Sequence, residues 1–318
     1  SHCLCCHVCH QAQLLLVYGA DAWQESQKRV LWIVFTAFFR NSSQQRYIIG
    51  DLPTGPDIGM QAYYINLDTR ADRLAHMQTQ CDALGFPAQR HAAVNAKDPE
   101  VIARAAACPP APDGIRMSAG AYACLQSHRA VWRRMLNGTD SHIMVLEDDL
   151  LLGKGITQYL AEDWIPPAAG VIKLETYATR QHLAMAEMRP AGPRVIVPIR
   201  SYHVGGGCYI LSRAAAEVLM RASDAPNLPV DELIFREAHL ADAGLETWQM
   251  VPAPAIQGDR TQGLVAADWA NTSITQHWES ASLVSPDHPP LPLRIWTRAT
   301  QELRARVMGT RYKVVPFG

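Results

Sequence analysis

From residue 60 onward, apolar and polar residues alternate along the chain in a pattern that predicts strands and helices in turn. Apolar runs bounded by polar residues predict strands at 62–68, 88–95, 142–149, 171–175, 194–199, 205–212 and 245–252. Helical spacing of apolar residues predicts helices at 71–85, 118–138, 213–223 and 229–244. The stretch 96–117, which contains CPPAPDG, predicts loops. This alternation indicates an α/β fold with a mainly parallel sheet flanked by helices.

Two parts of the chain differ from this central region of 60–260. Residues 1–59 begin with SHCLCCHVCH, which has four cysteines and three histidines but lacks the paired spacing that zinc sites normally use. We interpret 1–59 as an extension outside the functional fold, with Met60 as the natural first residue and a zinc site as the alternative. Residues 261–318 include an amphipathic basic helix from 293 onward, which predicts either peripheral contact with an anionic membrane or packing on its own domain.

Composition narrows the class of protein. The chain has 29 Lys+Arg against 30 Asp+Glu, and this balance disfavours a general nucleic-acid binder. The apolar run 30–39 is half of the roughly 20 residues that a membrane-spanning helix needs. Outside the first nine residues, four cysteines are scattered singly, which favours a reducing compartment. We therefore expect a cytoplasmic protein, with the inner face of the membrane as its place of peripheral contact.

Three consecutive carboxylates, Glu147, Asp148 and Asp149, follow a strongly apolar predicted strand. Ligands of α/β sheets sit at the carboxyl ends of strands. If strand geometry continues through 149, Glu147 and Asp149 share one face and Asp148 takes the other. Two converging carboxylates suit a hard divalent cation, whose charge would relieve their repulsion. The alternative is an acidic surface turn in which Asp149 caps the residues that follow.

Seven short motifs occur in an order that resembles glycosyltransferase family 25, which makes lipopolysaccharide and lipooligosaccharide and includes collagen galactosyltransferases. They are INLDTRADR (65–73), RHAAVNAKD (90–98), SAGAYACLQSH (118–128), VLEDDL (145–150), IKLET (172–176), YILSRAAAEVL (209–219) and PVDELIF (229–235). The resemblance implies a GT-A-like fold and transfer of a hexose, galactose above all, from a UDP-sugar to a cell-surface glycan or glycolipid acceptor. It also implies that 147–149 holds Mn²⁺, or alternatively Mg²⁺, against the donor diphosphate.

The same motifs suggest which other residues bind the donor. We assign Asn66, Asp68, Arg70, Arg73, Arg90, His128 and Asp148 to donor binding. For the arginines, the alternative is a place in the solvated first helical turn or in a structural salt bridge, and for His128 it is a buried histidine with a satisfied partner. The family's usual Gly-Glu-Ile-Gly-Cys is Gly-Ala-Tyr-Ala-Cys at 120–124, and its Asp-Gly is Asn-Ala at 95–96.

Inverting transfer, which the resemblance implies, needs a carboxylate to deprotonate the acceptor hydroxyl. Asp231 follows Pro229 at a predicted helix N-terminus, where the helix dipole keeps a carboxylate ionised. Glu175 ends a predicted strand. We expect Asp231 to be the base and Glu175 to bind a sugar hydroxyl, with N-capping as the alternative for Asp231. Because the 120–124 motif is altered, a glycan-binding or regulatory relative without turnover stays open, as does a metal-dependent hydrolase.

Overall fold

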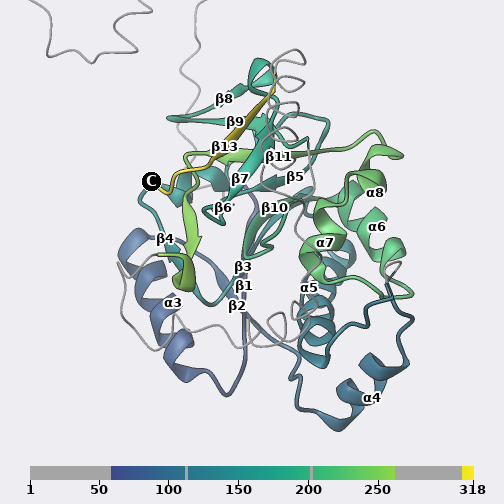
Figure 1. The fold of residues 1–318 in the computed structure, drawn as a ribbon. Coiled ribbons are helices and arrows are strands. Elements are labelled where there is room, and N and C mark those ends of the chain that lie inside the picture. Colours follow the sequence, from purple (N-terminus) through teal and green to yellow (C-terminus); the bar gives the residue numbers. More distant parts are fainter. Residues whose placement is uncertain (1–58, 112–113, 201–202, 262–309) are drawn as a thin grey trace, which may run out of the picture. The chain divides into compact units, whose positions relative to one another are not determined.

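The computed structural model describes residues 59–111, 114–200, 203–261 and 310–318, and Figure 1 shows how their helices and strands are arranged. The cysteine-rich start of the predicted extension and the predicted amphipathic helix from 293 both lie outside these ranges. Every helix within them is too short or too polar to cross a membrane.

A sheet of eight strands forms the centre of the described fold, in the order β2-β1-β3-β10-β5-β11-β9-β8. The pairings make β10 and β9 antiparallel to both of their neighbours, so the other six strands all run the same way. The predicted α/β class with a mainly parallel sheet is therefore confirmed. In sheet order the strands are Gln89–Ala92, Gln61–Asn66, His142–Glu147, Cys208–Ser212, Ala169–Lys173, Glu246–Val251, Arg194–Pro198 and Arg189–Ala191.

Helices cover the two faces of this sheet, as Figure 1 shows, with α3 on one side and α5 to α8 on the other. Strand β1 explains the division, because its side chains alternate between the faces. Tyr63 packs in the core that contains Trp132 of α5, whereas Tyr64 packs in the core that contains Met77 of α3. The helices are α3 (Ala71–Leu84), α4 (Pro99–Ala107), α5 (Ala119–Asn137), α6 (Arg213–Ala222), α7 (Val230–Phe235) and α8 (Glu237–Ala241).

Two smaller sheets complete the described strands. One has the order β4-β12-β6, and the other pairs β13 with β7. Residues 245–252 were predicted as the last strand, but β12 and β13 follow β11. The strands of these two smaller sheets are β4 (Leu150–Leu152), β6 (Glu175–Thr176), β7 (Arg180–Leu183), β12 (Ala255–Gln257) and β13 (Arg311–Val314).

Two of the predicted segments are wrong. The expected loop at 96–117 contains helix α4, whose N-cap Asp98 accepts a hydrogen bond from the Glu100 amide at 2.9 Å, with Pro99 in the first turn. The expected single helix at 229–244 is two short helices. Arg236 between them has ψ near 100°, an extended value that interrupts helical hydrogen bonding.

The reversed direction of β10 determines what lies at the ligand edge of the sheet. Cys208, the first residue of β10, pairs with Leu146 near the end of β3, and the Glu147 amide donates to the Gly207 carbonyl at 2.7 Å. The glycine run 205–207 precedes β10. It therefore lies at the same edge as the carboxyl ends of β3 and β5, beside the acidic residues that follow those strands.

Candidate active site

The three consecutive carboxylates do not continue strand β3. The strand ends at Glu147, Asp148 and Asp149 form a turn, and β4 begins at Leu150. The expectation that strand geometry extends through 149 is therefore wrong. The residue that follows strand β12 also holds this turn, because the Gly258 amide donates to the Asp149 carbonyl at 2.8 Å.

Asp148 is held entirely by protein groups. One carboxylate oxygen accepts a hydrogen bond from Asn66 Nδ2 at 2.7 Å, and the other lies 2.7 Å from Arg73 Nη1. Asp148 and Arg73 are both buried. These contacts tie the 148–149 turn to β1 and α3, so the geometry favours a positioning role for Asp148, while its predicted contact with the donor stays a prediction.

Asp149 combines burial with excess negative charge. Its Oδ2 lies 3.4 Å from Arg73 Nη1, whereas its Oδ1 is buried without a hydrogen-bond partner. Burial, and then the negative charge of Glu147, raise the pKa of Asp149 to about 8, although Arg73 opposes the shift. Arg73 therefore compensates the ionised form of this carboxyl only in part.

Glu147 points toward helix α5. Its Oε1 lies 3.3 Å from His128 Nε2 and 3.6 Å from Cys124 Sγ, and its Oε2 accepts from Gln257 Nε2 at 3.2 Å. His128 is fully buried, so the predicted donor contact would have to be made through Glu147. The His128 ring is held from behind, because its Nδ1 lies 2.8 Å from the Tyr209 hydroxyl.

Glu175 is fully buried next to a buried lysine. Its Oε1 accepts from the Gly207 amide at 2.8 Å and lies 3.3 Å from Lys173 Nζ, while its Oε2 has no hydrogen-bond partner. Burial raises the pKa of Glu175 to about 7, although the charge of Lys173 opposes the shift. Lys173 also donates to the carbonyls of Val204 and Gly205, and so fixes the glycine run.

Asp231 lies in the first turn of α7, as predicted, and it reaches the same glycine run. Its Oδ2 accepts from the Gly205 amide at 3.2 Å, and its Oδ1 accepts from the Glu232 amide at 3.0 Å. The N-cap residue of α7 is Pro229, so Asp231 is not the capping residue. Unlike Glu175, Asp231 is partly exposed.

The remaining predicted donor residues form ion pairs around the end of β1. Arg90 donates to the Asn66 side chain at 2.9 Å and pairs with the exposed carboxylate of Asp68. Arg70 pairs with Asp72 at 2.7 Å. These residues gather at the edge where the acidic residues lie, but their guanidinium groups are engaged by protein, so donor binding by Arg70, Arg73 and Arg90 stays a prediction.

The acidic side chains offer oxygen ligands of the kind that a hard divalent cation prefers, although among the described residues the set of three ligand atoms within 4.8 Å of one another is that of Cys124, His128 and Glu147. Asp149 and Glu175 each leave one buried carboxylate oxygen without a partner, and Glu147 is partly exposed beside them. Oxygen ligands of this kind suit Mn²⁺ or Mg²⁺. A cation bound by Glu147 and Asp149 would also offset the repulsion that raises the pKa of Asp149.

Sequence reasoning missed two residues that organise this site, Lys173 and Gln257. Lys173 carried a signal, because a single lysine in an apolar strand two residues before Glu175 predicts a buried ion pair on one face. Gln257 carried none, because β12 is three residues long and lies 110 positions from Glu147 in the chain.

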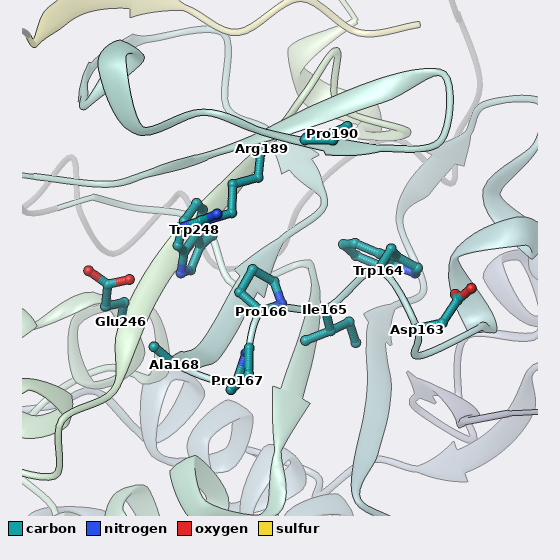
Figure 2. Close-up of a pocket in the computed structure, with 10 residues that line it drawn as sticks. All are labelled: Asp163, Trp164, Ile165, Pro166, Pro167, Ala168, Arg189, Pro190, Glu246 and Trp248. Atoms are coloured by element: carbon teal, nitrogen blue, oxygen red, sulfur yellow. The ribbon is translucent and has the colours of Figure 1, made fainter. Parts of the chain in front are cut away.

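A pocket of about 560 Å³ lies away from these residues, at the amino-terminal ends of β5 and β11, and Figure 2 shows its lining. None of the predicted site residues contributes to it. Its walls are Asp163, Trp164, Ile165, Pro166, Pro167, Ala168, Arg189, Pro190, Glu246 and Trp248.

Comparison with known proteins finds relatives among glycosyltransferases. The chain is 31% identical over 208 residues to the lacto-N-neotetraose biosynthesis glycosyltransferase LgtB of Neisseria gonorrhoeae, covering 62% of this chain and 74% of that protein. It is 27% identical over 152 residues to the lipooligosaccharide biosynthesis protein lic2B of Haemophilus influenzae, covering 45% and 55%. A crystal structure of a glycosyltransferase involved in glycosylation of the PBCV-1 major capsid superposes with a TM-score of 0.34 and 10% identity, over 70% of this chain and 98% of that one. Residues 60–234 match glycosyltransferase family 25 (LPS biosynthesis protein), and because this is more than half of the chain, the protein belongs to that family.

Proposed function

We propose that this protein is a metal-dependent, inverting glycosyltransferase that moves a hexose, galactose, from a UDP-sugar to a lipopolysaccharide or lipooligosaccharide acceptor. The observation that carries the proposal is the acidic edge of the sheet, where Asp149 and Glu175 each hold a buried, unpartnered carboxylate oxygen in a family 25 chain. The names of the relatives, which refer to lacto-N-neotetraose and lipooligosaccharide biosynthesis, support the acceptor class.

Glu147 and Asp149 would hold the cation, whose bound charge supplies Lewis-acid neutralisation of the leaving diphosphate. Asp148, Arg73 and Asn66 keep the turn that carries Asp149 in place. The Gly205 and Gly207 amides hold Asp231 and Glu175, and a Cβ at either glycine would lie within 2.8 Å of the Glu175 carboxylate.

Asp231 is the better base of the two remaining carboxylates. It is partly exposed, whereas Glu175 is fully buried and held by Lys173 and the Gly207 amide. In the proposed step the acceptor O–H bond breaks and its proton moves to Asp231, while the acceptor oxygen bonds to the sugar carbon. The bond from that carbon to the diphosphate oxygen breaks on the opposite face, so UDP leaves and the configuration inverts. Glu175 would bind a sugar hydroxyl.

The test is release of UDP from UDP-galactose with a lipooligosaccharide acceptor, with Mn²⁺ and with EDTA. We expect turnover that EDTA and Asp149→Asn abolish and that Asp231→Asn reduces at least about 100-fold, the lower range for general-base catalysis. Asp163→Asn, in the pocket at the opposite edge, is the matched carboxylate control and should behave as wild type.

Other results would select the alternatives. Near-normal turnover of Asp231→Asn with loss in Glu175→Gln would reverse the two assignments. Donor binding without turnover in the wild type would favour the regulatory relative that the altered 120–124 motif left open. UDP release that does not depend on acceptor would indicate a hydrolase.

We further propose that residues 261–318 bring the enzyme to an anionic membrane that carries a glycolipid acceptor. The predicted basic helix supports this, and it belongs to the part of the chain outside the described ranges. The test is sedimentation with anionic vesicles after charge reversal of Arg294, Arg298, Arg304 and Arg306. Removal of the whole tail is unsuitable, because β13 pairs with β7. Unchanged pelleting of the reversed variant would refute membrane contact through this helix.

A further inference from the structure

A second set of metal-ligand atoms lies directly beside the proposed cation site. Cys124 Sγ, His128 Nε2 and one carboxylate oxygen of Glu147 all lie within 4.8 Å of one another. Cys124 and His128 are four residues apart on α5, so they share one face of the helix, and that face meets the end of β3 at Glu147. The set differs in kind from the acidic edge, because it offers one sulfur, one nitrogen and one oxygen.

Two of the three distances within this set approach those of a tetrahedral zinc site, and the third, between Cys124 Sγ and His128 Nε2, is within 4.8 Å. With zinc bonds of about 2.3 Å to sulfur and about 2.0 Å to nitrogen and oxygen, tetrahedral angles put sulfur about 3.5 Å and nitrogen about 3.3 Å from the oxygen. The Glu147 oxygen lies 3.6 Å from Cys124 Sγ and 3.3 Å from His128 Nε2. Glu147 and Cys124 are partly exposed, which leaves a path for the ion and room for water as a fourth ligand.

The surroundings hold His128 and Glu147 in orientations that suit a cation. Tyr209 Oη accepts from Trp132 Nε1 at 2.8 Å and lies 2.8 Å from His128 Nδ1. When Nδ1 carries the proton and donates to Tyr209, the Nε2 lone pair faces Glu147, as second-shell partners arrange for metal-bound histidines. Gln257 holds the other oxygen of Glu147 at 3.2 Å, so Oε1 stays directed toward the helix.

We propose that Cys124, His128 and Glu147 form a binding site for a thiophilic divalent cation, Zn²⁺, which shares Glu147 with the hard-cation site. Thiolate and imidazole select zinc, whereas Mn²⁺ and Mg²⁺ select oxygen ligands. Zinc binding releases the Cys124 thiol proton to solvent and directs the Glu147 carboxylate away from Asp149. Zinc therefore displaces Mn²⁺ and inhibits transfer. Displacement and inhibition rest on the proposed function, whereas zinc binding itself does not.

Binding is tested with Co²⁺ as a spectroscopic substitute for zinc. The full chain is used with Cys3, Cys5, Cys6 and Cys9 replaced by serine, because the first ten residues contain other metal-ligand side chains. We expect one Co²⁺ per chain, with a thiolate-to-cobalt absorption band that Zn²⁺ removes. Cys124→Ser should abolish the band and weaken zinc binding by more than the roughly 10- to 100-fold that loss of an outer-shell partner costs.

Cys108 provides the matched control, since it is a free, buried cysteine that follows α4 and its thiol donates a hydrogen bond to the Arg104 carbonyl. Cys108→Ser should keep the band. Absence of a thiolate band in the serine background, or its survival in Cys124→Ser, overturns the site.

Sharing of Glu147 is tested by the electron paramagnetic resonance of Mn²⁺. We expect Zn²⁺ to release protein-bound Mn²⁺ from the Cys108→Ser protein but not from Cys124→Ser at the same concentration. Zinc binding that leaves Mn²⁺ in place overturns the sharing. If Mn²⁺ does not bind even without zinc, the metal dependence of the proposed function fails and the sharing fails with it, while the cobalt band still decides whether the zinc site exists.

Discussion

Lys173→Met removes a fully buried positive charge while keeping most of the side-chain volume. The Lys173 ammonium donates to the Val204 and Gly205 carbonyls and lies 3.3 Å from the Glu175 carboxylate, which is also fully buried. Methionine can replace none of these interactions. It leaves two carbonyl groups without the lysine donor and leaves the Glu175 carboxyl with the Gly207 amide but no positive charge, so we expect a loss of stability that depends on the charge of Glu175.

The magnitude follows from the protonation state of Glu175. Burial raises its pKa from 4.5 to about 7 in the folded protein. A raised acid pKa means that the folded state holds the proton more tightly than the unfolded state does. The contribution of protonated Glu175 to the free energy of unfolding is therefore fully present below pH 4.5 and is lost as the pH rises through 7. At roughly 1.4 kcal/mol for each pKa unit, Glu175 lowers the wild-type free energy of unfolding by about 3 kcal/mol across that window.

Loss of Lys173 raises the pKa of Glu175 further, because the lysine charge lowers it. At pH 5.5 the carboxyl is already neutral, and the variant loses the donor to two carbonyls, which costs about 2 kcal/mol. At pH 8.5 the folded variant must in addition either bury an unpaired carboxylate or take up a proton, and the cost rises toward the roughly 3–5 kcal/mol that follows removal of one partner of a buried ion pair.

The assay is urea unfolding followed by circular dichroism at pH 5.5 and 8.5, in EDTA so that bound cations do not contribute. Lys173→Met with Glu175→Gln is the control, and its loss of stability relative to Glu175→Gln should be similar at both pH values. A cost of Lys173→Met that is equal at the two pH values would refute the electrostatic reasoning. A cost below about 1 kcal/mol at pH 8.5 would refute it too, because that is the loss of stability expected for an exposed ion pair and a buried pair should cost more.

Three further substitutions test other parts of the site and its support. Gly207→Ala places a Cβ 2.6 Å from Glu175 Oε2 and should lower UDP release at least about 10-fold by displacing that carboxylate, whereas Gly206→Ala, with its nearest atom at 3.7 Å, should retain activity. Asp148→Asn replaces a buried carboxylate that accepts two hydrogen bonds, and urea unfolding should show a loss of about 3 kcal/mol; an unchanged midpoint would contradict its positioning role. Ser118→Ala removes the N-cap of α5 and should cost about 1 kcal/mol in the same assay, with unchanged UDP release.

Local pattern was enough to predict most of the sheet and the long helices. Strand β3 is apolar from Ile143 to Leu146 and ends at Glu147. Ser118 and Gly138 are the N-cap and C-cap of α5, as predicted. Because parallel neighbours end at one edge, β1 and β3 place Asn66 and Glu147 close to the same edge. The sequence also carries a signal for α4, because Asp-Pro-Glu at 98–100 is typical of a helix start. The prolines and glycine that follow the helix led to the prediction of a loop instead.

Strand direction and side-chain partners could not be predicted in this way. Alternation of polar and apolar residues is the same for both directions of a strand, so nothing in 205–212 indicates that β10 is reversed. The partners of Asp148 lie 82 and 75 positions away in the chain, at Asn66 and Arg73. Only the folded chain shows that Asp148 forms an ion pair with Arg73 and that Asp149 lies in the turn after the strand.

The distribution of positive charge supports the proposal that Glu147 and Asp149, the two outer carboxylates of the 147–149 run, bind a cation. Lys173 lies against Glu175, and Arg73 lies 2.7 Å from Asp148 but 3.4 Å from Asp149. Glu147 is held by an amide, an imidazole and a thiol, none of which carries the permanent positive charge of an arginine. The excess negative charge therefore lies on Glu147 and Asp149, and a divalent ion is the species that offsets both at once, because its charge exceeds that of either carboxylate.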